Sequence, residues 1–528
     1  MSHSFHGAAI SAQQLAALLD DGEEIALLDT REEGVYARNH LLLAASLPVS
    51  RLELDLHRRV PRRATRIVVI NDDQDAADVS GARLASLGYT QVAHLAGGNG
   101  AWLAAGYRLF SGLYVPSKAF GEVVEHTALT PRLTADEVHR LQATGAPLLI
   151  VDSRPFEEFR EFSVPGGLNC PGAELAARVA AQTKFLPPET TVVVNCAGRT
   201  RSIIGAQSLI NAGLPYKVVA LENGTMGWHL SGHPLAHGAD QVLEDAAPDE
   251  SLHIAARALS ARTGVQVVDW QQAEAFRRET ARTTYFYDVR LASAYLAGHL
   301  PGFDHAPGGQ LVQSTDFYAP VRGARIVVAD THGVQAHMTA HWLAQMGWNT
   351  YVLEPGADVP LVEGREPVAV QVPADAQGIS VDDLDAALVA GAVVVVDCGD
   401  SRAYRRRRLI GSSFATRSSL PRSLHSLPDL QRVFVSEDGS LARLAAADVL
   451  QAGGQAVFLD GGLNAWVAVG KPTEPGTDRF LSATDDAWYS PYQVPPEEMA
   501  DAMRSYISWE TDLLQAIDAE PGLRFRTL

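Results

Sequence analysis

The stretch TVVVNCAGRTRSIIGAQSLIN, residues 191–211, decides the fold that we expect for this chain. It begins as an apolar strand, continues through a loop that holds a cysteine and two arginines, and ends in a helical pattern. Cys196 therefore lies at a strand-to-helix turn. Backbone N–H groups and the positive end of a helix dipole favour thiolate over thiol at such a turn. Strand, thiol, glycine, arginines and helix follow one another in the order that thiolate chemistry needs.

Two arginines, Arg199 and Arg201, stand close to Cys196 in a chain with a formal net charge of −19. We interpret the loop as a small cradle for an anion. The competing interpretation is a structural thiol, because a lone cysteine is usually a small buried hydrophobe. The same structural interpretation applies to Cys170 and Cys398.

A strand ending of the same kind recurs four times along the chain. Each copy closes on an aspartate with an aromatic residue seven positions later, and three copies have an arginine two positions after the aspartate. Each copy is followed by a second strand, a helix ending near a glycine, and a third short strand. Such alternation predicts four small parallel sheets, each covered by helices. The four aspartates are Asp29, Asp152, Asp288 and Asp397.

Segments rich in proline, glycine and polar residues mark the expected domain boundaries. The predicted domains span residues 1–115, 128–236, 262–368 and 376–476, and residues 477–528 form an aromatic and helical tail. The helix of the tail is expected to open at Pro495 and Pro496. We expect the tail to pack on a domain. A role as a lid is the weaker hypothesis, because chain ends more often dock or fray.

The composition excludes several classes of function. At 528 residues with 46% hydrophobic and 20% charged residues, the chain is typical of a multidomain globular protein without a membrane span. The start lacks a signal-peptide pattern, so the cytoplasm is expected. The acidic balance opposes binding to nucleic acids and to acidic membranes. Three cysteines cannot form a disulfide framework, and their spacing matches no zinc site.

The Asp-x-Arg strand end, the Cys-x-x-x-x-Arg loop and a closing Gly-x-x-x-Trp, as in Gly224 with Trp228, together resemble the rhodanese sulfurtransferase family. The resemblance covers nearly the whole chain as four tandem rhodanese-like domains. It implies that Cys196 carries sulfur as a persulfide, from thiosulfate to a thiol or cyanide acceptor, without a metal or an organic cofactor. It also implies that the loop lowers the pKa of the thiol, and that Arg199 and Arg201 hold the anionic donor. The residues that would bind the donor and the persulfide are Ala197, Gly198, Arg199, Thr200, Arg201 and Ser202.

The other three copies lack the loop cysteine. When the copies are aligned on the glycines that end their helices, Asn71, Asp330 and Glu437 stand where Cys196 stands. Because none of these side chains can carry a persulfide, we predict that domains one, three and four are inactive. Asp152 and Arg154 are expected to form a structural ion pair, since the same pair recurs in copies without the cysteine.

Alternative functions stay open at this point. The protein could be a non-catalytic persulfide carrier or scaffold. A Cys-based phosphatase or arsenate reductase is less favoured, because phosphatases of this kind use Cys-x5-Arg and the residue at that position is Ser202. The cellular donor and acceptor are not determined by the sequence. The sequence also does not determine whether the protein forms a homodimer, or what role the inactive domains have.

Overall fold

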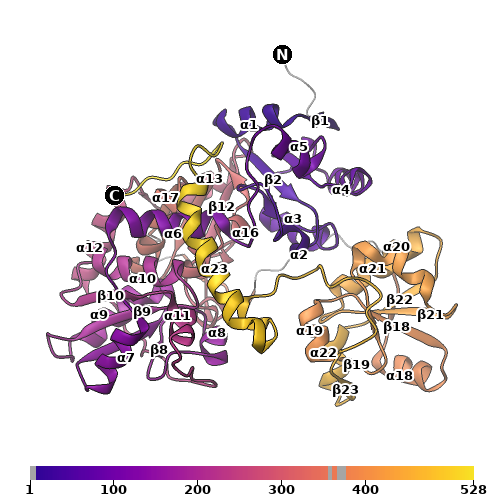
Figure 1. Ribbon diagram of the computed structural model, residues 1–528. Helices are drawn as coiled ribbons and strands as arrows, with labels where there is room; N and C mark the ends of the chain where they lie inside the picture. The colour runs from indigo at the N-terminus through magenta and orange to yellow at the C-terminus, as the bar shows by residue number, and fades with distance from the viewer. Residues whose placement is uncertain (1–6, 355–358, 366–375) are drawn as a thin grey trace.

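The computed structural model describes residues 7–354, 359–365 and 376–528. Four successive stretches of these residues each contribute five parallel strands to a sheet with helices on both faces (Figure 1). We call them units one to four. This confirms the predicted α/β fold of four tandem repeats with a helical tail. The domain boundaries stay predictions, and residue 368, the expected end of the third domain, lies outside the described residues.

In every unit the strands pair in the same spatial order, 1-5-4-2-3 by their position along the chain. The connections from the first to the second strand and from the third to the fourth strand therefore pass over the strands that lie between them. The central strands are largely apolar, mostly valine, isoleucine and leucine, with aromatic residues in unit three, as expected of a parallel sheet covered on both faces. The strands of unit one are β1 (Ala8–Ile10), β5 (Val92–Leu95), β4 (Arg66–Ile70), β2 (Ile25–Asp29) and β3 (Ala45–Ser46). Its helices are α1 (Ala12–Asp20), α2 (Glu33–Tyr36), α3 (Leu52–Arg59), α4 (Gln74–Ser86) and α5 (Gly98–Ala104).

Unit two contains the stretch that holds Cys196. Its strands are β6 (Arg132–Leu133), β10 (Lys217–Leu221), β9 (Thr191–Asn195), β7 (Leu148–Asp152) and β8 (Leu168–Asn169). Its helices are α7 (Ala135–Ala143), α8 (Phe156–Glu161), α9 (Leu175–Thr183), α10 (Thr200–Asn211) and α11 (Gly224–Leu230). Strand β9 is buried along its whole length and leads directly into the loop.

Units three and four repeat the plan. The strands of unit three are β11 (Gln266–Val268), β16 (Asn349–Leu353), β15 (Arg325–Ala329), β12 (Thr284–Asp288) and β13 (Asp304–His305). Its helices are α13 (Trp270–Arg278), α14 (Ala292–Ala297), α15 (Gly308–Gln313), α16 (Thr315–Tyr318) and α17 (Val334–Gln345). The strands of unit four are β17 (Gly378–Ile379), β22 (Ala456–Leu459), β21 (Gln431–Val435), β18 (Val393–Asp397) and β20 (Ser413–Phe414). Its helices are α18 (Val381–Val389), α19 (Ser401–Arg406), α20 (Leu420–Ser423), α21 (Ser440–Gln451) and α22 (Gly462–Ala468), and β19 (Arg408–Leu409) pairs with β23 (Thr473–Glu474) beside them.

The segments expected as linkers contain helices. Helix α6 (Val115–Ala128) precedes unit two and is buried over most of its length, and α12 (Glu250–Arg262) precedes unit three. Helix α6 packs on α10, which follows β9, and α12 packs on α17, which follows β15. Residues 116–127 fall between two predicted domains, and the structure places α6 there.

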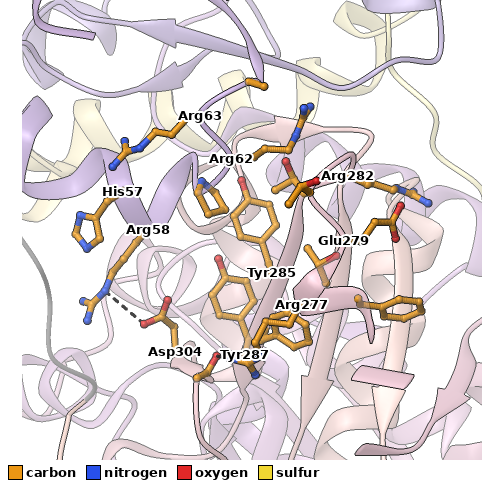
Figure 2. A pocket seen from close by; sticks show the side chains of 18 residues that line it. His57, Arg58, Arg62, Arg63, Arg277, Glu279, Arg282, Tyr285, Tyr287 and Asp304 are labelled. Carbon is orange, nitrogen blue, oxygen red and sulfur yellow. Dashed lines mark hydrogen bonds and ion pairs between the residues drawn. The ribbon is translucent and has the colours of Figure 1, made fainter. Parts of the chain in front are cut away.

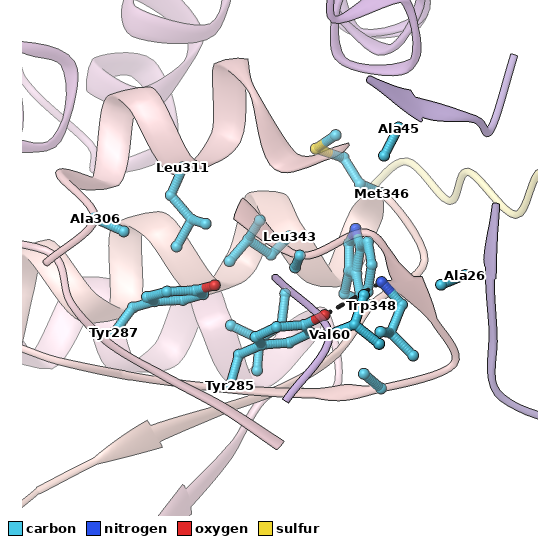
Figure 3. Packing of buried hydrophobic residues seen from close by; sticks show 14 of the residues in the cluster. Ala26, Ala45, Val60, Tyr285, Tyr287, Ala306, Leu311, Leu343, Met346 and Trp348 are labelled. Atoms are coloured by element: carbon cyan, nitrogen blue, oxygen red, sulfur yellow. Dashed lines mark hydrogen bonds between the residues drawn. The ribbon is translucent and has the colours of Figure 1, made fainter. Parts of the chain in front are cut away.

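Units one and three share one hydrophobic core. Strand β14 (Val321–Arg322) of unit three pairs antiparallel with β2 of unit one, so that Val321 lies opposite Ala26. Tyr285 lies among the packed side chains of this core (Figure 3). Its hydroxyl donates to the carbonyl oxygen of Arg59 at 2.5 Å and accepts from the N–H of Val321 at 3.2 Å. Because the cluster is continuous, these two units form one packed body.

Unit four lies beside the other three and has cores of its own (Figure 1). Its buried Arg417 joins it to unit one through an ion pair with Glu53 at 2.8 Å. The same arginine also pairs with Asp448 of unit four at 2.8 Å. The chain then crosses back, and the tail helix α23 (Pro496–Ala516) lies against α6 (Figure 1). None of the helices in the described ranges has the length and apolar character needed to span a bilayer.

Candidate active site

Cys196 follows the last residue of β9, and helix α10 begins at Thr200. The loop between them is held by the first turn of α11. The N–H of Thr225 donates to the carbonyl oxygen of Cys196 at 2.8 Å, and the N–H of Met226 donates to that of Ala197 at 3.0 Å. Gly224 has a φ of +55°, and a Cβ there would lie 2.3 Å from the carbonyl oxygen of Cys196. This close approach requires glycine at the start of the closing motif.

The sulfur of Cys196 is buried, with 2% of the residue exposed. The hydroxyl of Ser202 donates to it at 3.0 Å. Burial raises the pKa of the Cys196 thiol, and this effect outweighs the lowering by the charge of Arg201 and the Ser202 hydroxyl. The prediction of a lowered pKa is therefore wrong for the structure described, because the loop is covered rather than open to water.

Arg199 turns away from the thiol. Its guanidinium donates to both carboxylate oxygens of Glu122 at 2.7 Å, to Asn223 at 3.1 Å and also to Glu125. Its side chain is only 6% exposed. Two carboxylates from α6 therefore neutralise the charge of Arg199 in this arrangement, and the role of Arg199 in holding an anionic donor stays a prediction.

Arg201 is also paired, but it still acts on the thiol. Both of its terminal nitrogens donate to Glu158, at 2.9 and 2.8 Å. Its positive charge nevertheless lowers the pKa of Cys196. Arg201 can therefore stabilise a thiolate or a persulfide anion through space, and its contact with a donor stays a prediction.

A carboxylate from the tail occupies the start of α10. Glu510 accepts from the N–H of Thr200 at 3.4 Å and from its hydroxyl, and it is 1% exposed. Its second carboxylate oxygen is buried without a hydrogen-bond partner among the described residues. A Cβ at Gly198 would lie 3.3 Å from that oxygen and from the ring of Tyr506. The weaker hypothesis, a tail that covers the loop, therefore describes the structure better than a frayed end.

The aromatic residues of the tail complete this cover. The ammonium of Lys118 on α6 lies over the rings of Trp488, Tyr506 and Trp509, at 5.8, 4.9 and 4.8 Å from their centres. Burial lowers the pKa of Lys118 to about 8. The hydroxyl of Tyr492 lies 2.7 Å from that of Thr225, in the turn that holds the cysteine loop.

Sequence reasoning missed the tail contacts and Lys118. One signal was present, because Met503, Tyr506, Glu510 and Leu513 recur at the spacing of a single helical face. A glutamate within such an apolar stripe indicates a buried partner. The partners of Glu510 and Arg199 lie far away in the sequence, on α10 and α6, and no local pattern pointed to them.

Asp152 and Arg154 form the predicted structural ion pair. Arg154 donates to Asp152 at 2.9 and 2.7 Å and to the carbonyl oxygen of Phe162 at 2.6 Å, and both side chains are buried. The corresponding pairs of units one and three have the same geometry, with Arg31 on Asp29 and Arg290 on Asp288. The pair anchors the strand end and does not contact the thiol.

The other units carry different side chains after the matching strand. Asn71 and Asp330 follow β4 and β15 directly, as predicted. In unit four Ser436, and not Glu437, follows β21, and the N–H of Leu463 donates to its carbonyl oxygen as Thr225 does to Cys196. The one-residue slip arose at the double glycine that ends α21, where Gly453 rather than Gly454 has the positive φ.

A cavity of about 670 Å³ lies away from this loop, between units one and three (Figure 2). Arginines point into it from both units, and the described residues that line it belong to these two units alone. Tyr285 and Tyr287 form part of its wall (Figure 2). The cavity is therefore separate from the cysteine loop.

Comparison with known proteins supports the class that the fold and the site define, an α/β protein of repeated units with one thiol-bearing loop. The sequence profile of the rhodanese-like domain matches residues 11–105 and 134–231. A crystal structure of a thiosulfate sulfurtransferase from Pseudomonas aeruginosa is 42% identical. The match covers 98% of this chain and 100% of that chain, with a TM-score of 0.94. On this agreement the chain belongs to the rhodanese family.

A second relative matches only in part. An HTH-type transcriptional regulator of Mycobacterium tuberculosis is 32% identical over 107 residues, which cover 20% of this chain and 45% of the regulator. This chain therefore spans less than half the length of that relative.

Proposed function

We propose that this protein is a sulfurtransferase that moves sulfane sulfur from thiosulfate to a thiol or cyanide acceptor through a persulfide on Cys196. One observation carries the proposal. The four equivalent positions directly follow β4, β9, β15 and β21. Among them only Cys196 is a thiol, and it lies at the N-terminal end of α10. The similarity to the thiosulfate sulfurtransferase of Pseudomonas aeruginosa supports the same assignment.

The reaction has two balanced displacements at sulfur. The Cys196 thiolate attacks the outer sulfur of thiosulfate, the S–S bond of the donor breaks, and sulfite leaves with the bonding electron pair. The acceptor then attacks the terminal sulfur of the persulfide. Cyanide leaves as thiocyanate, a thiol leaves as its persulfide, and the Cys196 thiolate is restored.

Three groups of the loop can serve both displacements. The Ser202 hydroxyl points at the sulfur, and the charge of Arg201 favours an anion there. The N–H and hydroxyl of Thr200 donate to Glu510, and they are free for a donor anion once that carboxylate moves away. Fixed donors of this kind stabilise developing negative charge with little reorganisation.

The tail must move for the donor to reach the thiol. Cys196 is buried under α23, and the Glu510 carboxylate repels a doubly charged donor. We infer that the reactive form has α23 displaced from the loop. Units one, three and four act in this account as a scaffold that carries the tail and α6. The cytoplasm is the proposed setting, since the three free thiols suit a reducing compartment.

A steady-state assay tests the proposal. Purified protein is incubated with thiosulfate and cyanide, and thiocyanate is measured for the wild type, for Cys196→Ser and for the control Cys398→Ser. Turnover by the wild type and the control, with none by Cys196→Ser, supports a sulfurtransferase. Equal activity of wild type and Cys196→Ser contradicts it. Sulfur loaded on Cys196 without turnover would assign a persulfide carrier instead.

A further inference from the structure

Three side chains that can ligate a metal meet in unit three. His253 lies on α12, His337 lies on α17, and Glu354 follows β16. One donor atom from each lies within 4.8 Å of the other two. The Nε2 of His337 is 3.3 Å from Oε1 of Glu354, and the Nε2 of His253 is 3.9 Å from the same oxygen. The three donor atoms therefore lie close together.

The surroundings of His337 direct its Nε2 towards Glu354. This histidine is fully buried, and its Nδ1 lies 2.7 Å from the hydroxyl of Ser260. That hydroxyl donates its own proton to the carbonyl oxygen of Arg257 at 3.0 Å, so it can only accept from Nδ1–H. The Nε2 of His337 lies within hydrogen-bonding distance of Oε1 of Glu354, at 3.3 Å. A bound cation would take the place of the proton between these two atoms.

His253 supplies an independent observation. Its Nε2 is buried and makes no hydrogen bond within the described part of the chain. A buried ring nitrogen without a partner is costly, because it has lost water and gained nothing in return. A Cβ at Gly333 would lie 2.9 Å from this nitrogen, so the backbone at the start of α17 encloses it. A bound ion would supply the missing partner.

Glu354 is already oriented for such a role. Arg257 donates to its two carboxylate oxygens at 3.1 and 3.0 Å. When Oε1 binds an ion, the bond from Arg257 to Oε2 can remain and fix the carboxylate. Outer partners of this kind, here Arg257 for the carboxylate and Ser260 for the imidazole, are usual around bound metals.

We propose that His253, His337 and Glu354 bind one divalent transition-metal ion of the zinc type, through the two Nε2 atoms and Oε1, with water completing the coordination. Imidazole and carboxylate ligands suit zinc. Metal–ligand bonds of about 2.1 Å in a tetrahedral site separate neighbouring ligand atoms by about 3.4 Å. The pair His337 and Glu354 already has this spacing, at 3.3 Å. The donor atom of His253 lies within 4.8 Å of the other two, so it needs a shift of at most about 1.4 Å.

The site has a defined place in the repeat. It lies beside the loop that begins at Asp330, the position equivalent to Cys196. In unit two the helices α6 and α10 are tied there by Arg199 and Glu122, and in unit three the ion would tie α12 and α17. The role is structural and does not depend on the proposed sulfur transfer. The ligands are widely separated in the sequence, which explains why no spacing motif indicated them.

Zinc binding to the full chain tests the proposal. Protein treated with a chelator is dialysed against zinc, and bound zinc is counted by elemental analysis for wild type, His253→Ala and Glu354→Gln. His332→Ala removes an exposed histidine next to the loop, and Cys196→Ser removes the loop thiol, so these two variants serve as controls. The expected result is one zinc per chain in the wild type and both controls. His253→Ala and Glu354→Gln should bind at least about tenfold more weakly.

A second measurement separates binding from loss of fold. Circular dichroism without zinc should be the same for the wild type and the two ligand variants, because His253 and Glu354 are both partly exposed. Added zinc should raise the melting temperature of the wild type and not that of the variants. The absence of bound zinc from the wild type, or its full retention in both ligand variants, overturns the proposal.

Discussion

At the residue scale, the state of Cys196 is set by two opposing groups of contacts. Burial and the carboxylate of Glu510 raise the pKa of the thiol, whereas Arg201 and the Ser202 hydroxyl lower it. With the tail in place the first group prevails, and the sulfur is kept protonated and covered. Moving Glu510 away would remove both a negative charge and the barrier to water. Access and reactivity are thereby coupled through one side chain.

Glu510→Gln tests this coupling. The amide keeps an oxygen that can accept from Thr200 but carries no charge, so we expect the pKa of Cys196 to fall towards its ordinary value. The rate of alkylation of Cys196 by iodoacetamide at pH 7 should rise several-fold, because more of the thiol is ionised. The measurement is the alkylation rate as a function of pH. Glu497→Gln, an exposed change in the first turn of the same helix, is the matched control.

An unchanged alkylation profile in Glu510→Gln would show that burial alone holds the thiol protonated. The same rise in Glu497→Gln would show that the effect comes from a general loss of tail stability.

At the element scale, the geometry of the cysteine loop depends on the turn between β10 and α11. Two N–H groups of α11 hold the carbonyl oxygens of Cys196 and Ala197, and Gly224 lets the backbones approach. The turn therefore fixes the direction of the loop N–H groups, which is what a cradle for an anion needs.

Gly224→Ala is expected to spoil this turn. A Cβ in contact with the carbonyl oxygen of Cys196, at a positive φ, forces the loop to shift. We expect sulfur transfer to fall at least about tenfold and the free energy of unfolding to fall by about 2 kcal/mol. Thiocyanate formation and urea unfolding measure the two effects. Gly81→Ala on α4, where a Cβ meets nothing within 4 Å, should retain activity.

At this scale, local features were predictable from the sequence and long-range contacts were not. The strand, the cysteine turn and the helix from Thr191 to Asn211 were predictable because their signals are local. The carboxylates on Arg199 were not, because Glu122 lies 77 residues away in the sequence, on a helix between two predicted domains. Glu510 was missed for a similar reason, since it reaches the loop from the opposite end of the chain. Arginines that look free in a sequence can thus be paired in the fold.

At the scale of the whole molecule, the four units are not equivalent in how they are held. Units one and three share a core and a strand pairing, whereas unit four has its own core and meets unit one through Arg417. Unit four also lacks the arginine that elsewhere pairs with the strand-end aspartate. Its Asp397 is 5% exposed, and burial raises its pKa to about 7.

This unpaired aspartate gives a prediction about pH. The pKa of an aspartate in the unfolded chain is about 3.9, so folded unit four keeps a proton that the unfolded chain releases. Its stability should therefore fall as the pH rises from about 4 to about 7 and then stay level, by up to about 4 kcal/mol. Asp397→Asn should remove that loss and raise the melting temperature at pH 8. Calorimetry at pH 4 to 8 measures it.

Asp288 of unit three, which pairs with Arg290, is the control for which the opposite change in stability is expected. Asp288→Asn leaves the partly buried guanidinium of Arg290 without its charged partner, so it should lower stability at pH 8. A lower melting temperature for Asp397→Asn at pH 8 would mean that Asp397 is stabilised by its charge, against this account.

The central claim is that one sulfur atom, that of Cys196, carries the transferred sulfur. Its most direct test is a single turnover with thiosulfate and no acceptor, followed by mass spectrometry of peptides that contain each of the three cysteines. The account predicts an addition of about 32 Da on the peptide with Cys196, lost when cyanide is added, and no addition on those with Cys170 or Cys398. An unmodified Cys196, or the added sulfur on another cysteine, would contradict it.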